Sequence, residues 1–262
     1  MKPFWKHAPE IAARLAAGRL LVTLDFDGTL AALAETPGQA SLRPEFKAAL
    51  RALAARPGVS VFILSGRALP NVRRLVGLRR LYYGGNHGME IQGPGLAWRD
   101  AGAARARLRL AAAAADLRER FPEGTGILVE YKTFSVSVHY RALKPAYRAG
   151  FFARMRALAA AGGGLRWTRG HKVFELRPAG APHKGDAVLR LGRKLAAAAA
   201  LAVGDDLTDE DMFAALAARG VTVRVGRKAR SAAEYFLPAQ ADVLSLLRFA
   251  TAAREGGEHE RS

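Results

Sequence analysis

The chain of 262 residues is 50% hydrophobic, contains no cysteine and has a formal net charge of +18. This length can bury the core of one large domain or of two modest ones, and the hydrophobic fraction argues against a disordered chain. The absence of cysteine excludes disulfides, thiolate metal sites and a cysteine nucleophile. No apolar run approaches the roughly 20 residues that span a bilayer, so we expect no membrane partner.

The first 20 residues and the net charge indicate the cellular location and the binding partners to expect. The stretch MKPFWKHAPEIAARLAAGRL has neither the apolar segment nor the small-residue cleavage site of a signal peptide, so we expect a cytoplasmic protein. A strongly basic chain can bind nucleic acid, but here the basic residues are scattered, without interleaved aromatic residues or a nucleic-acid-binding motif. We therefore expect no nucleic-acid partner. A basic surface would still attract a small anionic substrate.

The first hundred residues alternate between predicted strands and helices. Residues 20–26 form an apolar run that is typical of a strand buried on both faces. Residues 44–55 begin with Pro-Glu and place Leu50 and Leu53 at helical spacing. A second buried strand follows in PGVSVFILSGR, a helix in ALPNVRRLVG, and a third strand with a glycine-rich exit in LYYGGNHGMEI. This alternation predicts βαβ units and a parallel sheet.

The pattern changes near residue 100. AGAARARLRLAAAAADLRERF predicts one long helix, and GILVEYKTFSVSVHYR predicts a hairpin with its turn at about Lys132–Thr133. A helix at about 144–161, a break at the glycines 162–164 and a second hairpin in LRWTRGHKVFELRP follow. This order of helix, hairpin, helix and hairpin predicts a small α+β unit.

The first pattern resumes at KGDAVLRLGRKL, with a strand in AALAVGDD, a helix at 209–218, a strand in VTVRV and a last helix near 239–253. The predicted fold class is α/β: a doubly wound, Rossmann-like parallel-sheet core of residues 1–99 and 179–262, with an inserted α+β domain of residues 100–178. The insertion has 15 basic and 6 acidic residues, half of the net charge. A charged lid over an anion site and a chance distribution both account for this excess.

Four polar clusters lie at the carboxyl ends of predicted strands. They are Asp25, Asp27 and Thr29; Ser65, Gly66 and Arg67; Lys184; and Asp205, Asp206 and Asp209. Ligands bind beyond the carboxyl ends of the strands in an open parallel sheet, so we expect these clusters to share one site. Two carboxylates about 4 Å apart repel by roughly 4 kcal/mol at an effective dielectric constant near 20, so the acidic groups must bind protons or a cation. Oxygen ligands without cysteine favour Mg²⁺.

The other groups at these strand ends fit a phosphate. Ser65 and Thr29 supply hydroxyl donors, and glycines beside them let backbone N–H groups approach an anion. Lys184 can neutralise a phosphoryl group in the transition state. The sequence has no GxxxxGK[ST] loop, which argues against a nucleotide site of that type.

Four short motifs, DFDGT, SGR, a Lys followed by Gly, and GDDLTDED, resemble in their order the motifs of the haloacid dehalogenase-like phosphotransferases. The resemblance implies that Asp25 is a nucleophile that accepts a phosphoryl group, and that Asp27 protonates the leaving oxygen and then activates water. It implies further catalytic roles for the groups that hold the phosphoryl oxygens: Ser65, Lys184 and Thr29. It also implies a Mg²⁺ site of Asp25, Asp27 (through its backbone carbonyl), Asp205 and Asp206, with Asp209 in support.

Longer strings resemble trehalose-6-phosphate phosphatases: YYGGNHGMEI, VEYKTFSVSVHYR, GHKVFELRP, KGDAV and VGDDLTDEDMF. The resemblance implies that residues 100–178 are a cap domain that selects a small-molecule sugar phosphate, and that the products are trehalose and phosphate. It implies a set of substrate-binding residues: Gly66, Arg67, Asn86, His87, Glu130, Lys132, Arg141, Lys172 and Glu175. Glu130 and Lys132 equally fit a cross-strand surface pair, Arg141 a solvated strand end and His87 a core histidine.

Other functions stay open on the sequence alone. A related phosphatase could act on sucrose phosphate or on a broad set of hexose phosphates, and a phosphomutase could use the same motifs. A receiver-type regulatory domain also unites acidic residues, a hydroxyl and a lysine, but it has neither DxDGT nor a cap. We expect a monomer.

Overall fold

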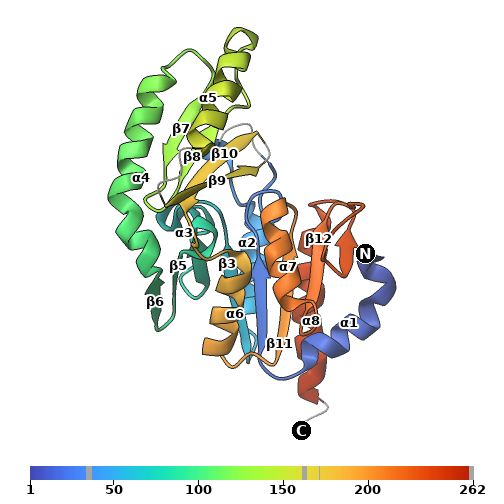
Figure 1. Ribbon diagram of the computed structural model, residues 1–262. Helices are drawn as coiled ribbons and strands as arrows, with labels where there is room; N and C mark the ends of the chain where they lie inside the picture. Colours follow the sequence, from blue (N-terminus) through green and yellow to red (C-terminus); the bar gives the residue numbers. More distant parts are fainter. Residues whose placement is uncertain (34–36, 161–163, 171, 260–262) are drawn as a thin grey trace. The chain divides into compact units, whose positions relative to one another are not determined.

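The computed structural model describes residues 1–33, 37–160, 164–170 and 172–259. The chain divides into two compact units, the first of Met1–Trp98 and Pro182–Ser262 and the second of Arg99–Ala181 (Figure 1). Within the described ranges, no helix combines the length and the apolar character that crossing a bilayer would require.

A nine-stranded sheet forms the centre of the first unit, in the order β1, β13, β12, β11, β2, β3, β4, β5 and β6. All neighbours from β1 to β4 are parallel, and β5 returns antiparallel to β4. The predicted parallel core is therefore confirmed. The strands are β1 (Lys2–Pro3), β2 (Leu20–Leu24), β3 (Val59–Leu64), β4 (Tyr82–Gly85), β5 (Glu90–Gly93), β6 (Leu96–Arg99), β11 (Ala199–Gly204), β12 (Val221–Val225) and β13 (Tyr235–Leu237).

Helices cover both faces of this sheet, which confirms the doubly wound arrangement. One core cluster joins the sheet to α1 (Ala8–Ala16), α2 (Pro44–Ala54), α3 (Leu69–Val76) and α8 (Asp242–His259). A second cluster joins the opposite face to α6 (Lys184–Lys194) and α7 (Glu210–Leu216). All five residues of β2 are buried because alternate side chains enter the two clusters, Val22 the first and Leu21 the second. Short 3₁₀ helices lie at Phe4–His7, Pro37–Gln39, Asn86–Gly88 and Leu207–Asp209.

The segment LYYGGNHGMEI contains more than the single strand that its pattern predicts. β4 ends at Gly85, and the 3₁₀ helix Asn86–Gly88 connects it to the antiparallel strand β5. Asn86 and His87 have φ angles of 49° and 58°, values that few residues other than glycine adopt. Two such residues in succession reverse the chain.

The second unit is a four-stranded antiparallel sheet with two helices on one face. The strand order is β7, β8, β10 and β9, and both predicted hairpins are confirmed, β7 with β8 and β9 with β10. The glycine break predicted at 162–164 lies mostly outside the described residues. The elements are α4 (Ala101–Arg120), β7 (Leu128–Tyr131), β8 (Val136–His139), a 3₁₀ helix (Pro145–Tyr147), α5 (Arg148–Ala160), β9 (Leu165–Gly170) and β10 (Val173–Pro178).

The two faces of this second sheet differ in chemistry. Val129, Val138 and Leu176 lie in a hydrophobic core with residues of α4 and α5. Successive side chains of a strand point to opposite faces, so the residues that alternate with this apolar set share the other face. Their register pairs Glu130 with Ser137 and Ser137 with Glu175. One face of the sheet is therefore polar.

Candidate functional site

The strand order of the first unit reverses between β2 and β11. The chain runs from β2 through β3 to β4 on one side, and from β11 through β12 to β13 on the other. Open α/β sheets bind their ligands at such a switch point, outside the carboxyl ends of the strands. Asp25 follows β2 and Asp205 follows β11, so both lie there. The Asp25 N–H also donates a hydrogen bond of 2.9 Å to the Val203 carbonyl in β11.

The carboxylates of Asp25, Asp205 and Asp209 form an acidic cluster, in which one oxygen of each residue lies within 4.8 Å of one oxygen of each of the others. Lys184 is the first residue of α6, so its predicted place at the end of a parallel strand is wrong. From the start of the helix it places its ammonium group against two of these carboxylates. Its Nζ donates to Asp25 Oδ1 at 2.5 Å and to Asp209 Oδ1 at 2.7 Å. Asp25, Lys184 and Asp209 are 5%, 2% and 0% exposed. The structure thus brings together groups from three separate sequence motifs.

Burial and neighbouring charges shift the pKa values of Asp25, Asp205 and Lys184. Burial raises the pKa of Asp25 well above its ordinary value, and the neighbouring carboxylates add to this effect while Lys184 opposes it. Burial and the charge of Asp209 raise the pKa of Asp205 to about 7, against a hydrogen bond from Thr29. Burial alone would lower the pKa of Lys184, but the charges of Asp209 and Asp25 outweigh it and raise that pKa. The single charge of Lys184 is therefore too little to balance the three carboxylates.

The donor set fits a hard divalent cation, because the three clustered side chains offer only carboxylate oxygens. Both Asp209 oxygens already accept hydrogen bonds, Oδ1 from Lys184 and Oδ2 from the N–H groups of Asp205 and Asp206 at 2.9 Å each. Asp25 and Asp205 are therefore the better ligands. Gly28 has a φ of 85°, and a Cβ atom on it would collide with the Asp205 carboxylate, so only glycine fits.

Asp206 differs from its neighbours, because the carboxylates that cluster among the described residues do not include it. Its N–H donates to Asp209 and its carbonyl accepts from Arg224. The metal role that the sequence suggests for Asp206 stays a prediction.

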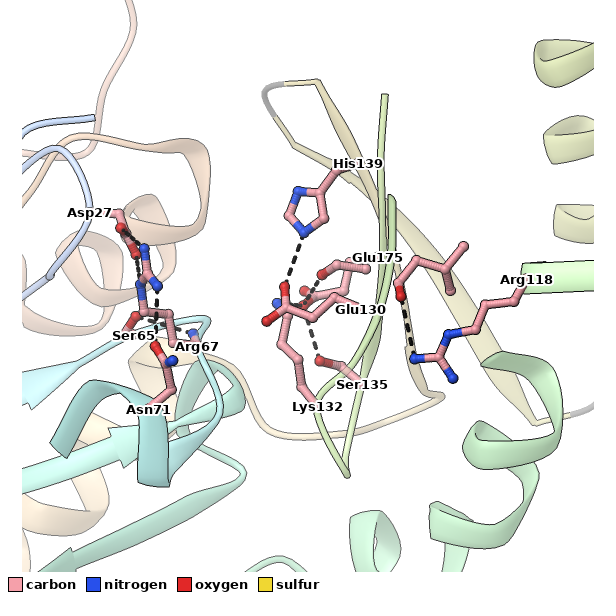
Figure 2. Close-up of polar contacts among 12 residues, drawn as sticks. Asp27, Ser65, Arg67, Asn71, Arg118, Glu130, Lys132, Ser135, His139 and Glu175 are labelled. Atoms are coloured by element: carbon pink, nitrogen blue, oxygen red, sulfur yellow. Dashed lines mark hydrogen bonds and ion pairs between the residues drawn. The ribbon is translucent and has the colours of Figure 1, made fainter. Parts of the chain in front are cut away.

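Asp27 is paired with Arg67, as Figure 2 shows. The guanidinium donates through Nη2 to Asp27 Oδ1 at 2.6 Å and through Nε to Oδ2 at 2.7 Å, a bidentate geometry. Arg67 also donates to Asn71 Oδ1 at 3.1 Å and lies over the ring of the buried Phe26. In this structure the Asp27 carboxylate is therefore paired with the guanidinium of Arg67, which belongs to the SGR motif.

The SGR loop and the turn after β4 are hydrogen-bonded to each other. The His87 N–H donates to the Ser65 carbonyl at 2.9 Å, and the Asn86 N–H donates to the Arg67 carbonyl at 2.8 Å. A Cβ atom at Gly66 would meet the His87 ring, so glycine permits this approach. The Asn86 side chain is fully buried and donates to Glu90 Oε1 at 2.9 Å. These contacts hold Ser65 at the strand end; substrate contacts by Asn86 and His87 stay predictions.

Thr29 also lies at the switch point. It is fully buried, and its hydroxyl donates to Asp205 Oδ1 at 3.0 Å. It therefore orients the carboxylate of Asp205.

The polar face of the second unit carries a hydrogen-bonded group around Glu175 (Figure 2). Glu175 Oε1 accepts from Lys132 Nζ at 3.0 Å, from Ser135 Oγ at 3.1 Å and from Ser137 Oγ at 3.4 Å. On the same face, Glu130 Oε2 lies 3.0 Å from His139 Nε2. This face offers charged partners of both signs.

Arg141 and Lys172, the other two substrate-binding candidates in this unit, lie in its connections. Arg141 follows β8, Lys172 has a φ of 59° in the turn between β9 and β10, and both are exposed. Their substrate contacts stay predictions.

Arg224 is a buried residue of this site that the sequence interpretation missed. The alternating pattern VTVRV is typical of a strand with one solvated face, which would place the arginine in water. Instead it is 5% exposed, and its guanidinium donates to the backbone carbonyls of Asp205 and Asp206. The sequence held one signal of this burial: Arg224 is the only charged residue in VTVRV, the next strand after the GDD segment.

The parallel sheet, its switch point behind DFDGT and the inserted α+β unit define an α/β protein with the haloacid dehalogenase-like fold. The predicted fold class is confirmed. The chain belongs to the trehalose-phosphatase family, whose model matches residues 23–241.

The chain is similar to relatives with two different names. A trehalose-phosphate phosphatase of Mycobacterium marinum is 38% identical over 80% of this chain and 55% of its own length. An uncharacterized glycosyl hydrolase of Mycobacterium tuberculosis is 40% identical over 94% of this chain but only 19% of its own length. The chain thus spans 55% of the length of the first relative and 19% of the length of the second.

Solved structures show the same fold. Trehalose-6-phosphate phosphatase of Aspergillus fumigatus matches with a TM-score of 0.65 at 26% identity, over 94% of this chain and 97% of that one. The C-terminal domain of the Candida albicans trehalose-6-phosphate phosphatase matches with a TM-score of 0.78 at 22% identity, over 94% of this chain and 97% of that one.

Proposed function

We propose that this chain is a Mg²⁺-dependent phosphatase that hydrolyses trehalose 6-phosphate to trehalose and phosphate. The supporting observation is the group of buried Asp25, Lys184 and Asp209 with half-buried Asp205 at the switch point, in a chain of the trehalose-phosphatase family. In this proposal the first unit is the catalytic core. The second, Arg99–Ala181, is a cap that selects the substrate.

The cation would be held by the side chains of Asp25 and Asp205 and by the backbone carbonyl of Asp27, with Asp209 in support. When bound, Mg²⁺ supplies positive charge that neutralises the carboxylates and the substrate phosphate. The all-oxygen donor set and the raised pKa values of Asp25 and Asp205 support this assignment.

Asp25 would carry out the first chemical step. One of its carboxylate oxygens attacks phosphorus, the bond between phosphorus and the sugar oxygen breaks, and the phosphoryl group stays on Asp25 as an acyl phosphate. Lys184 already contacts Asp25 Oδ1 and would stabilise the negative charge of the transferring group. Ser65 would donate its hydroxyl hydrogen to a phosphoryl oxygen at the same strand ends. Thr29 would do so only after its hydroxyl has turned away from Asp205 Oδ1, to which it donates in this structure.

Asp27 would move the protons. In the first step it donates a proton to the departing sugar oxygen; in the second it takes a proton from water, which attacks phosphorus and releases phosphate and free Asp25. The bidentate contact with Arg67 must open before Asp27 can act. A phosphoryl group that binds Arg67 would replace the carboxylate as its anionic partner and release Asp27.

The cap would recognise the disaccharide. A sugar with many hydroxyl groups needs several directed hydrogen-bond partners, and charged groups form the stronger bonds. The polar sheet face supplies Glu130, Lys132 and Glu175, and the exposed connections supply Arg141 and Lys172.

A substrate panel tests this function. Phosphate release from trehalose 6-phosphate should exceed release from sucrose phosphate and glucose 6-phosphate, measured as kcat/KM with Mg²⁺ present. Equal turnover of glucose 6-phosphate would replace the narrow assignment by a broad hexose-phosphate phosphatase. An isomerised product without free phosphate would indicate a phosphomutase.

Removal of divalent metal should stop turnover reversibly. Excess chelator should reduce phosphate release to background, and added Mg²⁺ should restore it, because the cluster has too little positive charge of its own. Mg²⁺ at 100 times its Kd should also stabilise the fold by about 2.7 kcal/mol, measured as a shift in thermal unfolding. Full activity in excess chelator would remove Mg²⁺ from the scheme.

Glu130→Gln should impair recognition of the sugar but not the chemistry. A hydrogen bond to a charged group contributes about 1.5–3 kcal/mol, so kcat/KM for trehalose 6-phosphate should fall roughly 10- to 150-fold. Turnover of p-nitrophenyl phosphate, which has no sugar, should be unchanged. Glu123→Gln alters an exposed carboxylate of the same unit and serves as the control. An equal loss with both substrates would argue against a sugar-binding role.

A further inference from the structure

Arg224 is a buried charge on an apolar strand. Val221, Val223 and Val225 of β12 enter one core cluster, so Thr222 and Arg224 point to the opposite face. Arg224 is in register with Gly204, the last residue of β11 before the acidic loop 205–209. A buried guanidinium is tolerated only when its donors are paired.

The guanidinium of Arg224 holds two consecutive carbonyl groups of the acidic loop. Nη2 donates to the Asp205 carbonyl, and Nη1 donates to the Asp206 carbonyl at 3.2 Å. An arginine side chain presents its donors in a rigid planar fork, so it fixes the spacing of two acceptors in a way that lysine cannot.

The same two residues are held from their other side by Asp209, whose Oδ2 accepts their N–H groups at 2.9 Å each. Hydrogen bonds to Arg224 and Asp209 therefore fix both the carbonyl and the amide groups of Asp205 and Asp206. Thr29 then sets the direction of the Asp205 carboxylate.

Glu210 holds Arg224 in place. Its Oε1 accepts from Arg224 Nη1 at 2.7 Å, and its Oε2 accepts from Ser231 Oγ at 3.0 Å and from the Ala232 N–H at 2.7 Å. The guanidinium is thus anchored to the segment between β12 and β13 and has one orientation toward the loop.

We propose that Arg224 is a positioning residue for the divalent cation: it fixes the backbone of Asp205 and Asp206 so that the Asp205 carboxylate faces the metal. This inference rests on the metal site of the proposed function and adds to it a residue that touches neither metal nor substrate. Partners that orient metal ligands affect metal affinity about 10- to 100-fold.

The test is metal affinity, measured without substrate by electron paramagnetic resonance of bound Mn²⁺ and by its displacement with Mg²⁺. Arg224→Met keeps the apolar stem and removes the fork, so the Kd for Mn²⁺ should rise about 10- to 100-fold. Arg224→Lys restores the charge but not the paired donors, so it should recover only part of the affinity. Glu210→Gln, which weakens the anchor, should give a smaller loss.

Arg14→Met is the matched control. Arg14 makes the same kinds of bonds in the same unit, to the Gly220 carbonyl at 2.8 Å and to Glu234 Oε2 at 2.9 Å. It should lower the thermal unfolding midpoint and leave the Kd for Mn²⁺ unchanged. An equal loss of affinity in Arg14→Met would show that lost stability alone weakens the metal site, and would overturn the proposal.

Two further results separate this inference from the proposed function. If Arg224→Met folds and binds Mn²⁺ as tightly as the wild type, the role of Arg224 is overturned and the metal site stays intact. If Arg224→Met does not fold, wild-type affinity for Mn²⁺ in both Arg224→Lys and Glu210→Gln would overturn the role of Arg224. Failure of the wild-type protein itself to bind Mn²⁺ would overturn the metal site, and this inference with it.

Discussion

Asp25→Asn should reduce phosphate release from trehalose 6-phosphate by about 10⁵- to 10⁶-fold, the scale on which loss of the attacking side chain affects other covalent hydrolases. The amide is a far weaker nucleophile than the carboxylate, and it removes one negative charge from the cation site. Asp27→Asn should cost less, about 10²- to 10⁴-fold, because it removes general acid–base catalysis only.

The fold should survive Asp25→Asn. Asparagine has nearly the same shape, its carbonyl oxygen can accept from Lys184 Nζ, and Lys184 keeps Asp209 as its charged partner. Burial raises the pKa of Asp25, so the native state disfavours its ionised form and a neutral side chain carries no such cost. The thermal unfolding midpoint should therefore equal or exceed that of the wild type. Loss of activity in an unfolded variant would contradict the expected stability and would not assign the nucleophile. Substantial remaining turnover would exclude Asp25 as the nucleophile.

Lys184→Met should damage both stability and activity. The ammonium group lies between Asp25 and Asp209, with all three side chains nearly inaccessible to solvent. Removal of one partner from a buried ion pair costs about 3–5 kcal/mol, because a charge is left unpaired in the interior. We expect this loss in the free energy of unfolding, measured by denaturant titration, together with loss of turnover.

Two variants separate the effect of the buried charge from that of a lost lysine. Lys194→Met changes an exposed lysine at the other end of the same helix and should alter stability little. Lys184→Met combined with Asp209→Asn removes one of the stranded carboxylates and should recover part of the stability. An unchanged free energy of unfolding in Lys184→Met would contradict the buried ion pair.

The sequence predicted the parallel core because its signal is strong and local. The run before Asp25 is almost wholly apolar, which is typical of a strand covered on both faces, and β2 is buried throughout. The meeting of Asp25 and the acidic loop follows from one rule, that parallel strands end at the same edge of a sheet. Lys184 lies outside this rule, because it begins α6 instead of ending a strand. Motif order then sufficed to place side chains from distant parts of the chain together.

Other features depend on partners that local patterns do not reveal. The reversal after β4 rests on positive φ angles at Asn86 and His87, residue types that adopt this conformation more often than most but far less often than glycine, so the sequence does not fix it. The pairing of Asp27 with Arg67 and the burial of Arg224 depend on which polar groups the folded chain places beside them. The edge strand β1 and its neighbour β13 are too short, at two and three residues, for a periodic pattern.

The central claim is that Asp25 accepts the phosphoryl group. The most direct measurement is rapid-quench mass spectrometry of Asp27→Asn after mixing with p-nitrophenyl phosphate, whose leaving group needs no proton donor, so that only the hydrolytic step is slowed. We expect a burst of p-nitrophenol and a phosphorylated peptide with the modification on Asp25. A burst with phosphate on another residue, or steady turnover with every peptide containing Asp25 unmodified, would contradict it.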